Sequence, residues 1–475
     1  MSMKHLKTSL ETSDEEGGDI QQPQIYAKNS MDRFGDDLCA LLLSYLPFKD
    51  RFRCECVSKQ FQRTVFGSVV HVILHKAFIS FDTQLLATIA KKCPNIQTIE
   101  CRVIGNKYEE LIPELLSIFR DNCRHLRHIY CNLRENSDQL CLPFGPLVTQ
   151  VGSVSFDNKR SLILCHRLSH LVIHSLYDAF DYFPGRQLVA KNLQSLAFYN
   201  FSGHSNDQLS ALVAGNQSIR CLKLVNRLQS RLTPETLTEM CGQLSRLTQL
   251  RRLTLELRLN DNENSLNNSL RTIGEKCWRL QRLTLELFMR DEPLEGQPLE
   301  GQPIDALKYY RRLKRLHLTL DPVFGQRLLE PLKLCHRLTH LTIWLHTKND
   351  KTSVDQLLDN NCGNYWPRLQ YLYIRFNEFG GQCLDHIPRL PALQTLVFHC
   401  RQDIGLNDNE YSDLLSRNMA QQLTQMMASL EITDENNEDN IQQTQSGPAM
   451  DLHHYHPGIS SYEHSLKTNR TIIHN

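Results

Sequence analysis

Residues 250–257 read LRRLTLEL, and residues 280–287 repeat that sequence with a single substitution, as LQRLTLEL. In both segments the first, fourth and sixth residues are leucines, with polar or charged residues between them. Self-similarity at a fixed period is the sequence signature of a repeat architecture, in which one structural unit is stacked many times. The two segments therefore indicate a repeat, and the same spacing recurs along most of the 475-residue chain.

The spacing apolar-x-x-apolar-x-apolar occurs in twelve copies. They begin at residues 96, 126, 151, 168, 193, 219, 250, 280, 313, 338, 369 and 393, and the copy at 151 is the weakest. The first and last lie 297 residues apart, a mean of 27 over eleven intervals, within the 20–29-residue range of leucine-rich repeats. The pattern predicts an α/β leucine-rich-repeat solenoid, with parallel strands on the concave face and helices on the convex face. Return segments such as 85–90 and 266–273 have helical apolar spacing.

The cysteines follow the same repeat. Seven of the 16 stand either three residues before the first apolar position of a copy or at its last apolar position: Cys93, Cys123, Cys165, Cys277, Cys335, Cys101 and Cys131. Free cysteine is among the most buried residue types, so this placement predicts packing at the turns between helices and strands. No C-x-x-C pair occurs, and copies about 27 residues apart set these thiols in a row. We therefore expect no metal site and no cofactor.

Charge and hydropathy exclude several classes of protein. The chain has 53 Lys and Arg against 52 Asp and Glu, a net charge of +1, which disfavours binding of the whole chain to nucleic acid or to a membrane surface. No apolar run approaches the ~20 residues that span a bilayer, and residues 1–19 lack the apolar core of a secretory signal. We expect a cytoplasmic or nuclear protein with its cysteines as thiols.

The composition divides the chain into five parts. Residues 1–30 and 431–475 are polar, with few apolar side chains to offset the entropy of ordering, and are predicted to be a disordered leader and a disordered polar tail. Residues 67–405 form the solenoid. Apolar residues at helical spacing predict a C-terminal capping helix at 406–430, which would cover the last unit. Residues 31–66 have no repeat and form a separate helical module.

The module at 31–66 has an apolar stripe at helical spacing, which Pro47 ends. The stripe consists of Leu38, Leu41, Leu42 and Tyr45. Asp50 is predicted to be the N-cap of the next helix. About 36 residues are too few to enclose a core, so the apolar side chains need either the adjoining solenoid or a partner chain. Composition leaves both alternatives open.

The same module resembles an F-box. The family pattern is matched in order by Phe34, Gly35, Asp37, Leu38, Leu42, Leu43, Ser44, Tyr45, Leu46, Pro47, Asp50, Cys54, Val57, Ser58, Lys59 and Phe61. Phe34-Gly35 replaces the family's Leu-Pro, and Phe61 replaces its Trp. The resemblance implies a substrate-recognition subunit of a Skp–cullin–F-box ubiquitin ligase, which is not itself an enzyme. It also implies that the Skp adaptor, and through it cullin, is contacted by Phe34, Leu38, Leu42, Leu46, Phe52, Val57 and Phe61.

A second candidate site follows from strand alternation. If Leu253 and Leu255 face the core, residues 252, 254 and 256 face the concave surface, and so do their equivalents in later copies. Arginine and aromatic residues, the types that most often dominate interfaces, collect there. The predicted binding face for an unknown protein substrate, with an acidic or phosphorylated segment, comprises Arg252, Arg282, Arg315, His317, Trp344, Tyr371 and Tyr373.

Motifs of catalysis are absent from the sequence: G-x-S-x-G, the P-loop and H-E-x-x-H do not occur. We therefore predict no catalytic residues. Two alternatives to a ligase subunit stay open at this point. One is a solenoid scaffold that binds a protein without any ubiquitin machinery. The other, which the balanced charge disfavours, is a repeat protein that binds RNA or DNA through its arginine column.

Overall fold

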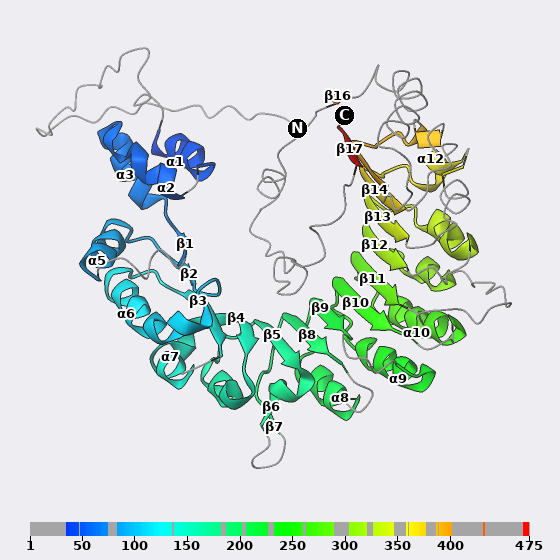
Figure 1. Ribbon diagram of the computed structural model, residues 1–475, viewed down its shortest axis with the longest axis horizontal. Helices are drawn as coiled ribbons and strands as arrows, with labels where there is room; N and C mark the ends of the chain where they lie inside the picture. Colours follow the sequence, from blue (N-terminus) through cyan, green and yellow to red (C-terminus); the bar gives the residue numbers. More distant parts are fainter. Residues whose placement is uncertain are drawn as a thin grey trace, which may run out of the picture.

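The computed structural model describes most of the module and of the solenoid. The described residues are 35–46, 48–74, 83–134, 137–181, 187–201, 206–226, 232–259, 263–288, 304–320, 326–345, 358–359, 361–376, 386–387, 389–400, 431–432 and 469–474. They form an open arch, with strands along its inner side, helices along its outer side and the helical module at one end (Figure 1). This arrangement confirms the predicted α/β leucine-rich-repeat solenoid preceded by a small helical module.

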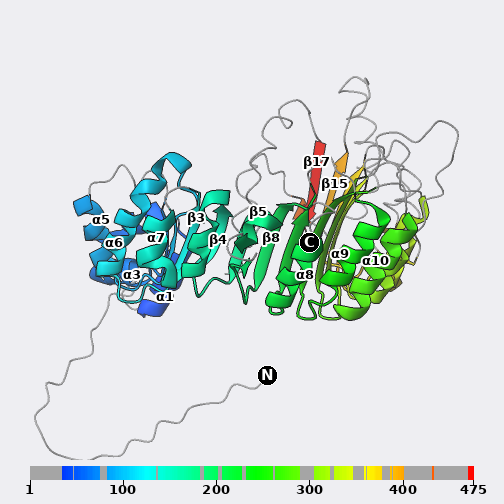
Figure 2. The same cartoon turned by 90° about the horizontal axis from the view of Figure 1, so that it is seen from below.

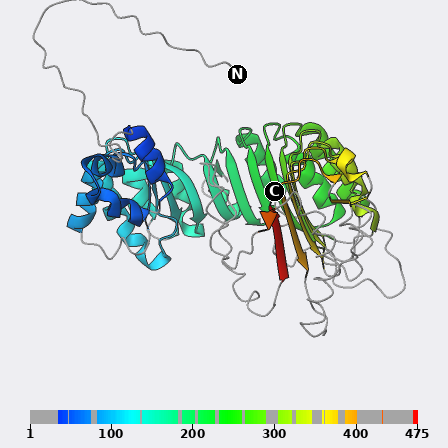
Figure 3. The same cartoon turned by 90° about the horizontal axis from the view of Figure 1, so that it is seen from above.

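A single sheet follows the arch from end to end, and Figures 2 and 3 show its strands side by side. Thirteen of its described strands pair in parallel, in chain order: β1 (His71–Ile73), β2 (Thr98–Glu100), β3 (His128–Leu133), β4 (Val148–Val154), β5 (His170–Ser175), β8 (Ser195–Asn200), β9 (Cys221–Val225), β10 (Arg252–Arg258), β11 (Arg282–Phe288), β12 (Arg315–Leu320), β13 (His340–Leu345), β14 (Tyr371–Phe376) and β15 (Thr395–Cys400). Two further strands, β6 (Phe180–Asp181) and β7 (Gln187–Leu188), form a small separate sheet.

Helices and 3-10 turns return the chain from one strand to the next on the outer side. The helices are α5 (Thr83–Lys92), α6 (Ile112–Asn122), α7 (Ser137–Phe144), α8 (Asn206–Gly215), α9 (Pro234–Leu244), α10 (Glu263–Lys276) and α12 (Cys362–Tyr365). The 3-10 turns are η3 (Asn106–Leu111), η4 (Gly145–Leu147), η5 (Phe156–Leu164), η6 (Leu176–Ala179), η8 (Asp305–Tyr309) and η9 (Gln326–Leu334). Among the described residues, 3-10 turns take the place of an α-helix between β4 and β5, before β12, and between β12 and β13.

The predicted ends of the chain fall largely outside the described residues. This holds for the leader at 1–30, the capping helix at 406–430 and most of the tail at 431–475. Two short parts of the tail belong to the sheet: β17 (Asn469–His474) pairs antiparallel with β15, and β16 (Glu431–Ile432) pairs with β17. These six and two residues therefore extend the sheet beyond β15.

The core is a set of stacked apolar rows. Leu253, Leu283, Leu316 and Leu341 pair in register from β10 to β13, and all are buried. Leu255 and Leu285 stack in the same way two residues later along their strands. Because burying one leucine side chain contributes about 1.5–3 kcal/mol, each unit gains most of its stability from its neighbours.

The weakest copy, at 151, was placed in the wrong register. Val151 pairs with Leu171, the second apolar residue of its copy, so Val148 and not Val151 holds the first position. Phe156, predicted to close the strand, begins the 3-10 turn η5 instead. Valines at 148, 151 and 154 recur every three residues, so the spacing alone fits two registers, and the pairing with β5 decides between them. The pairing of β4 with β3 is irregular, with register shifts between Ile129 and Tyr130 and between Cys131 and Leu133.

The seven repeat cysteines are buried, as their spacing predicts. Cys277 shows why a small side chain suits the turn before a strand. Its Sγ lies 3.5 Å from the main-chain oxygen of Leu247 in the preceding unit, a contact that a larger side chain would prevent. Burial raises the pKa of Cys93, Cys277 and Cys335 to about 12, so these groups are thiols at neutral pH.

Alkylation of the native chain should therefore be selective. Iodoacetamide at pH 8 is expected to modify Cys56, which is exposed, at least a hundredfold faster than Cys93 or Cys277, because only the thiolate reacts and only an accessible one is reached. Peptide mass spectrometry over a time course measures the rates. Similar rates at Cys56 and Cys277 in the folded chain would show that the turns are open, contrary to the packing described.

Candidate partner-binding surfaces

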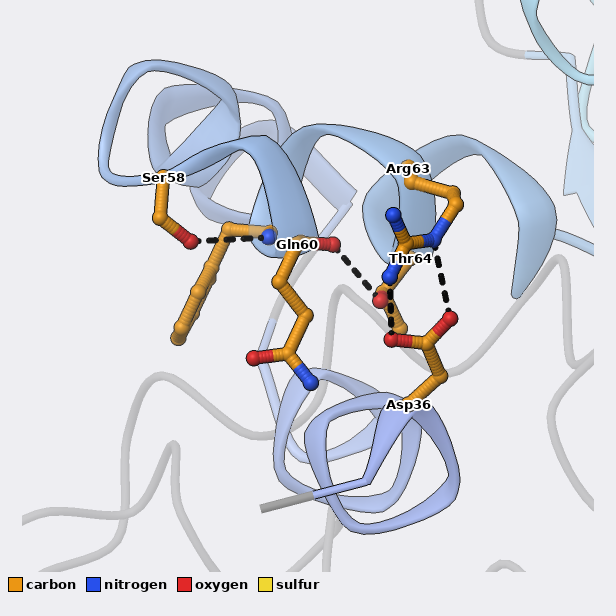
Figure 4. A network of polar contacts seen from close by, with 6 residues as sticks. Asp36, Ser58, Gln60, Arg63 and Thr64 are labelled. Atoms are coloured by element: carbon orange, nitrogen blue, oxygen red, sulfur yellow. Dashed lines mark hydrogen bonds and ion pairs between the residues drawn. The ribbon is translucent and has the colours of Figure 1, made fainter. Parts of the chain in front are cut away.

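The helical module consists of α1 (Asp36–Ser44), α2 (Phe48–Arg53), the 3-10 turn η2 (Cys54–Cys56) and α3 (Lys59–Gly67). A fork of two hydrogen bonds joins its first and last helices: Arg63 Nε and Nη2 donate to Asp36 Oδ2 and Oδ1 at 2.9 and 2.7 Å (Figure 4). The hydrogen bond from Arg63 lowers the pKa of the Asp36 carboxyl. Ser58 caps α3, because its Oγ accepts the main-chain N–H of Phe61. These contacts fix α1 across α3.

Arg51 holds the end of α1 against α2. Its Nε donates to the main-chain oxygen of Leu46, and its Nη2 donates to that of Ser44, both at 2.8 Å. Carbonyls at a helix C-terminus lack partners within the helix, so a side-chain donor from the next helix satisfies them. Asp50, predicted as the N-cap of α2, instead lies inside the first turn and pairs with Arg53 at 2.9 Å. The helix begins at Phe48, three residues before Arg51, which an N-cap at Asp50 would make its first residue.

Helix α1 has two apolar faces that differ in burial. Cys39 and Leu43 are buried within the module and belong to the core. The opposite face is apolar and open: Leu38, Leu41, Leu42 and Tyr45 are 40, 53, 44 and 79% exposed. We call these four side chains the outer face of α1. Residues at this spacing share one side of a helix, so the module presents a continuous apolar strip to solvent.

The seven residues taken from the family pattern do not all lie on that strip. Val57 is exposed, whereas Leu46, Phe52 and Phe61 are partly buried and pack against the core. The ring of Phe52 meets that of Phe66 edge-on at 5.3 Å. Phe34 lies outside the described residues. The contacts implied by the family resemblance include Leu38 and Leu42 of the outer face. They do not include Leu41 and Tyr45, which belong to the stripe that the helical spacing predicts.

The module is also fastened to the first repeat. Lys92 of α5 pairs with Glu55 at 2.8 Å, and its Nζ lies 4.7 Å from the centre of the Phe66 ring. Asn95 Nδ2 donates to the main-chain oxygen of Gly67 at 2.9 Å. The apolar side chains of the module thus divide: one set packs inward and toward the solenoid, and the outer face of α1 is left accessible.

The concave face aligns the predicted residues in rows. Strand pairing places Arg252, Arg282, Arg315, His340 and Tyr371 in one row across β10 to β14. The next row contains Thr254, Thr284, His317, Thr342 and Tyr373, and the third contains Glu256, Glu286, Thr319, Trp344 and Arg375. Their apolar neighbours along each strand are buried. All seven residues predicted for the concave site therefore lie on one face.

Aromatic side chains meet at the end of these rows. The ring centres of His317 and Trp344 lie 5.5 Å apart, and those of Trp344 and Tyr373 lie 6.2 Å apart. Arg375, which was not among the predicted site residues, places its guanidinium carbon 5.0 Å from the Trp344 ring centre. His340 stacks on Tyr371 at 5.7 Å. The structure thus joins the aromatic part of the site through direct contacts.

The arginine row produces a positive potential that affects the pKa of two neighbouring groups, His340 and Cys221. Burial, together with Arg315 and Arg282, lowers the pKa of His340 to about 4. Burial raises the pKa of the Cys221 thiol, and nearby arginines, chiefly Arg252 and Arg282, act in the opposite direction. His340 is therefore neutral at pH 7, and the row adds no charge beyond its arginines.

Stability should consequently depend on pH through His340. Its pKa is about 4 in the folded chain and about 6.5 when unfolded, so the unfolded chain binds more protons and stability is lost as pH falls from about 6.5 toward 4. His340→Gln should remove part of this loss. Urea unfolding of both chains at pH 7 and pH 5 measures the difference. An NMR titration midpoint near 6.5 for His340 in the folded chain would contradict the expected shift.

Comparison with known proteins identifies the module. Residues 31–71 match the family model of the F-box domain, five residues beyond the predicted end. The chain thus contains an F-box domain followed by a leucine-rich-repeat solenoid. A chain in the crystal structure of the Rad7 and Elc1 complex in yeast is similar over 76% of this chain and 87% of that chain, with 12% identity and a TM-score of 0.38. No curated protein matches the chain.

The described residues contain neither a membrane-spanning helix nor a cluster of metal ligands. In the part of the chain that the structure describes, no helix has the length and apolar character needed to cross a bilayer. Within the same residues no three His, Cys, Asp or Glu side chains gather as metal ligands would. The two surfaces that stand out chemically are the outer face of α1 and the concave face of β10 to β14.

Proposed function

We propose that the chain is the substrate-recognition subunit of a Skp–cullin–F-box ubiquitin ligase. It docks on a Skp-type adaptor through the outer face of α1 and holds a protein substrate on its concave face. The observation that carries the proposal is the accessible apolar strip of Leu38, Leu41, Leu42 and Tyr45 within a segment that matches the F-box domain. A cytoplasmic or nuclear location fits this role.

The chemistry of the strip supports docking. An amphipathic helix that keeps one apolar face packed inward and the other open suits insertion into an apolar groove of a partner. Burying four partly exposed apolar side chains contributes up to about 1.5–3 kcal/mol each, which offsets the entropy lost on association. The contacts of Arg63 with Asp36 and of Arg51 with Ser44 hold α1 in place beforehand, so little ordering remains to be done on binding.

The concave face supplies the second half of the proposal. Arg, Trp and Tyr combine a large contact area with directed hydrogen bonds, and here they lie in adjoining rows. A substrate held there is kept at a high effective concentration near the conjugating enzyme that other subunits bring. The chain itself makes and breaks no bond in this mechanism; its role is to hold and orient.

The ligase role is tested by affinity purification of the full chain and of a Leu38→Asp/Leu42→Asp variant, followed by mass spectrometry. Both leucines are exposed, so the change acts on the docking surface and leaves the core of the module intact. Skp and cullin subunits are expected with the intact chain and not with the variant. If the intact chain retains protein partners but no Skp or cullin subunit, the protein is a scaffold without a ligase role.

The substrate face is tested separately. A variant with Arg282→Ala, Arg315→Ala and Trp344→Ala is expected to lose co-purification of the main substrate while it retains the Skp adaptor, because the two surfaces lie in different parts of the arch. Unchanged hydrogen-exchange protection of the amides in β11 to β13 shows that the variant solenoid is folded. Unchanged recovery of the substrate would contradict the assignment of this face.

A further inference from the structure

The strands β10 and β11 carry opposite charges at opposite ends of the concave face. Arg252 and Arg282 pair in register near the start of the two strands, and Glu256 and Glu286 pair four residues later. Threonines at 254 and 284 occupy the row between them. At ~3.3 Å per residue, the positive and negative rows are ~13 Å apart along the strands. The face is therefore polarised along the strand direction.

The positive end extends beyond the first row. Residues 246–252 and 310–315 lead into β10 and β12 and read RLTQLRR and YRRLKR, without an acidic residue. The main-chain N–H of Arg251 donates to the oxygen of Arg220 at 2.8 Å, so cations in successive units stand side by side just before the sheet. Arg315 continues the first row into β12. The lowered pKa of His340 is consistent with a positive potential at this end.

We propose that the face of β10 to β12 binds an extended polypeptide segment of mixed charge, which lies along the strands. An acidic run of the segment contacts the arginine row, and a basic run about four residues away contacts Glu256 and Glu286. This inference rests on the proposed substrate face and specifies its ligand. The threonine hydroxyls between the two rows suit a short neutral stretch of the same segment.

The negative row argues against two other ligands. A nucleic-acid strand carries a phosphate at every nucleotide, so one laid along β10 would bring phosphates against Glu256. A uniformly acidic peptide would meet the same repulsion at Glu286. The negative row spans two strands, because Glu256 pairs with Val225 of β9 and Glu286 pairs with Thr319 of β12. Arg258, which is exposed at the end of β10, follows two residues after Glu256. Opposite charges at a fixed separation favour one direction of binding, since reversing the segment places like charges together.

The full chain is tested against a phage-displayed library of random 12-residue peptides. Enriched peptides are expected to carry acidic and basic residues in one constant order, about four positions apart. Against the best such peptide, a Glu256→Lys/Glu286→Lys chain should bind at least tenfold more weakly. The same peptide with its Lys and Arg residues changed to Glu should recover binding to that variant chain. Recovery by complementary exchange requires contact between the two charge sets.

Matched controls keep the test decisive. Glu256→Gln/Glu286→Gln removes charge without reversing it and should weaken binding less. Unchanged hydrogen-exchange protection of the amides in β10 and β11 shows that each variant is folded. Enrichment of uniformly acidic peptides, enrichment of none, or tighter binding of a 12-nucleotide oligouridylate would overturn the inference. If Arg282→Ala with Arg315→Ala and Trp344→Ala still loses the substrate in such a case, the substrate face stands and only the mixed-charge ligand fails.

Discussion

Changing Leu41 and Tyr45 to glutamate is expected to weaken binding of a purified Skp-type adaptor at least thousandfold. These are the two most exposed side chains on the outer face of α1, at 53 and 79%. The variant loses two apolar contacts worth about 1.5–3 kcal/mol each and places two carboxylates in an apolar interface. A loss of ~4 kcal/mol already corresponds to about a thousandfold in the dissociation constant. Isothermal titration calorimetry on the full chain measures it.

The control for this experiment is Leu85→Glu. Leu85 is 47% exposed on α5, so its exposure is close to that of Leu41, and the substitution adds one carboxylate to a helix outside the docking surface. It should leave adaptor affinity within about twofold, and neither variant should alter the thermal unfolding midpoint by more than ~2 °C. If the Leu41→Glu/Tyr45→Glu chain binds the adaptor as tightly as the unmodified chain, the outer face of α1 is not the docking surface.

Trp366→Ala is expected to lower the free energy of unfolding around β13 and β14 by about 3–5 kcal/mol. Trp366 is the largest fully buried side chain described, and its Nε1 donates to the main-chain oxygen of Leu332 at 2.9 Å. The substitution leaves a cavity and removes a bond between two successive units. Because repeat proteins can unfold in parts, hydrogen exchange of the amides in β13 and β14 is the appropriate measurement.

Trp278→Ala is the matched control for that change. Trp278 is 48% exposed in the turn before β11, where the guanidinium carbons of Arg279 and Arg312 lie 4.8 and 4.5 Å from its ring centre. Removing it costs surface cation–π contacts and leaves no cavity, so we expect about 1 kcal/mol or less. Equal loss of protection in the two variants would contradict the distinction between buried and surface tryptophan.

The repeat period explains why so much of the concave face was predictable. Each strand is short, and its two inward apolar residues occupy fixed positions, so residues such as Arg282 and Arg315 must share a row once the period is known. That logic fails where apolar residues offer two registers. Val148 and Val151 are equally suitable by spacing, and the pairing of Val151 with Leu171 of β5 selects Val148 as the first position.

The F-box surface was less predictable, for a different reason. A helical pattern identifies an apolar stripe but not which neighbour will cover it, because that depends on how α1, α2 and α3 cross. The family pattern grouped Leu42 with Phe52, yet the structure leaves Leu42 open and packs Phe52 on Phe66. Aligned motifs record residues that a family keeps, both for folding and for docking. Only tertiary packing separates the two roles.

The contacts of Lys92 with Glu55 and of Asn95 with Gly67 fix the F-box module to the first unit of the arch, so distances along the arch can be counted from the F-box. Seven strands, β1 to β5, β8 and β9, lie between that end and the charged rows of β10. In the proposed ligase role, the number of units between the F-box and β10 sets the span between the adaptor and the substrate. Inserting one unit before β10 would displace the substrate by one strand spacing, ~4.8 Å, along the arc. The substrate lysine that lies nearest to the conjugating enzyme would therefore change in steps of one unit.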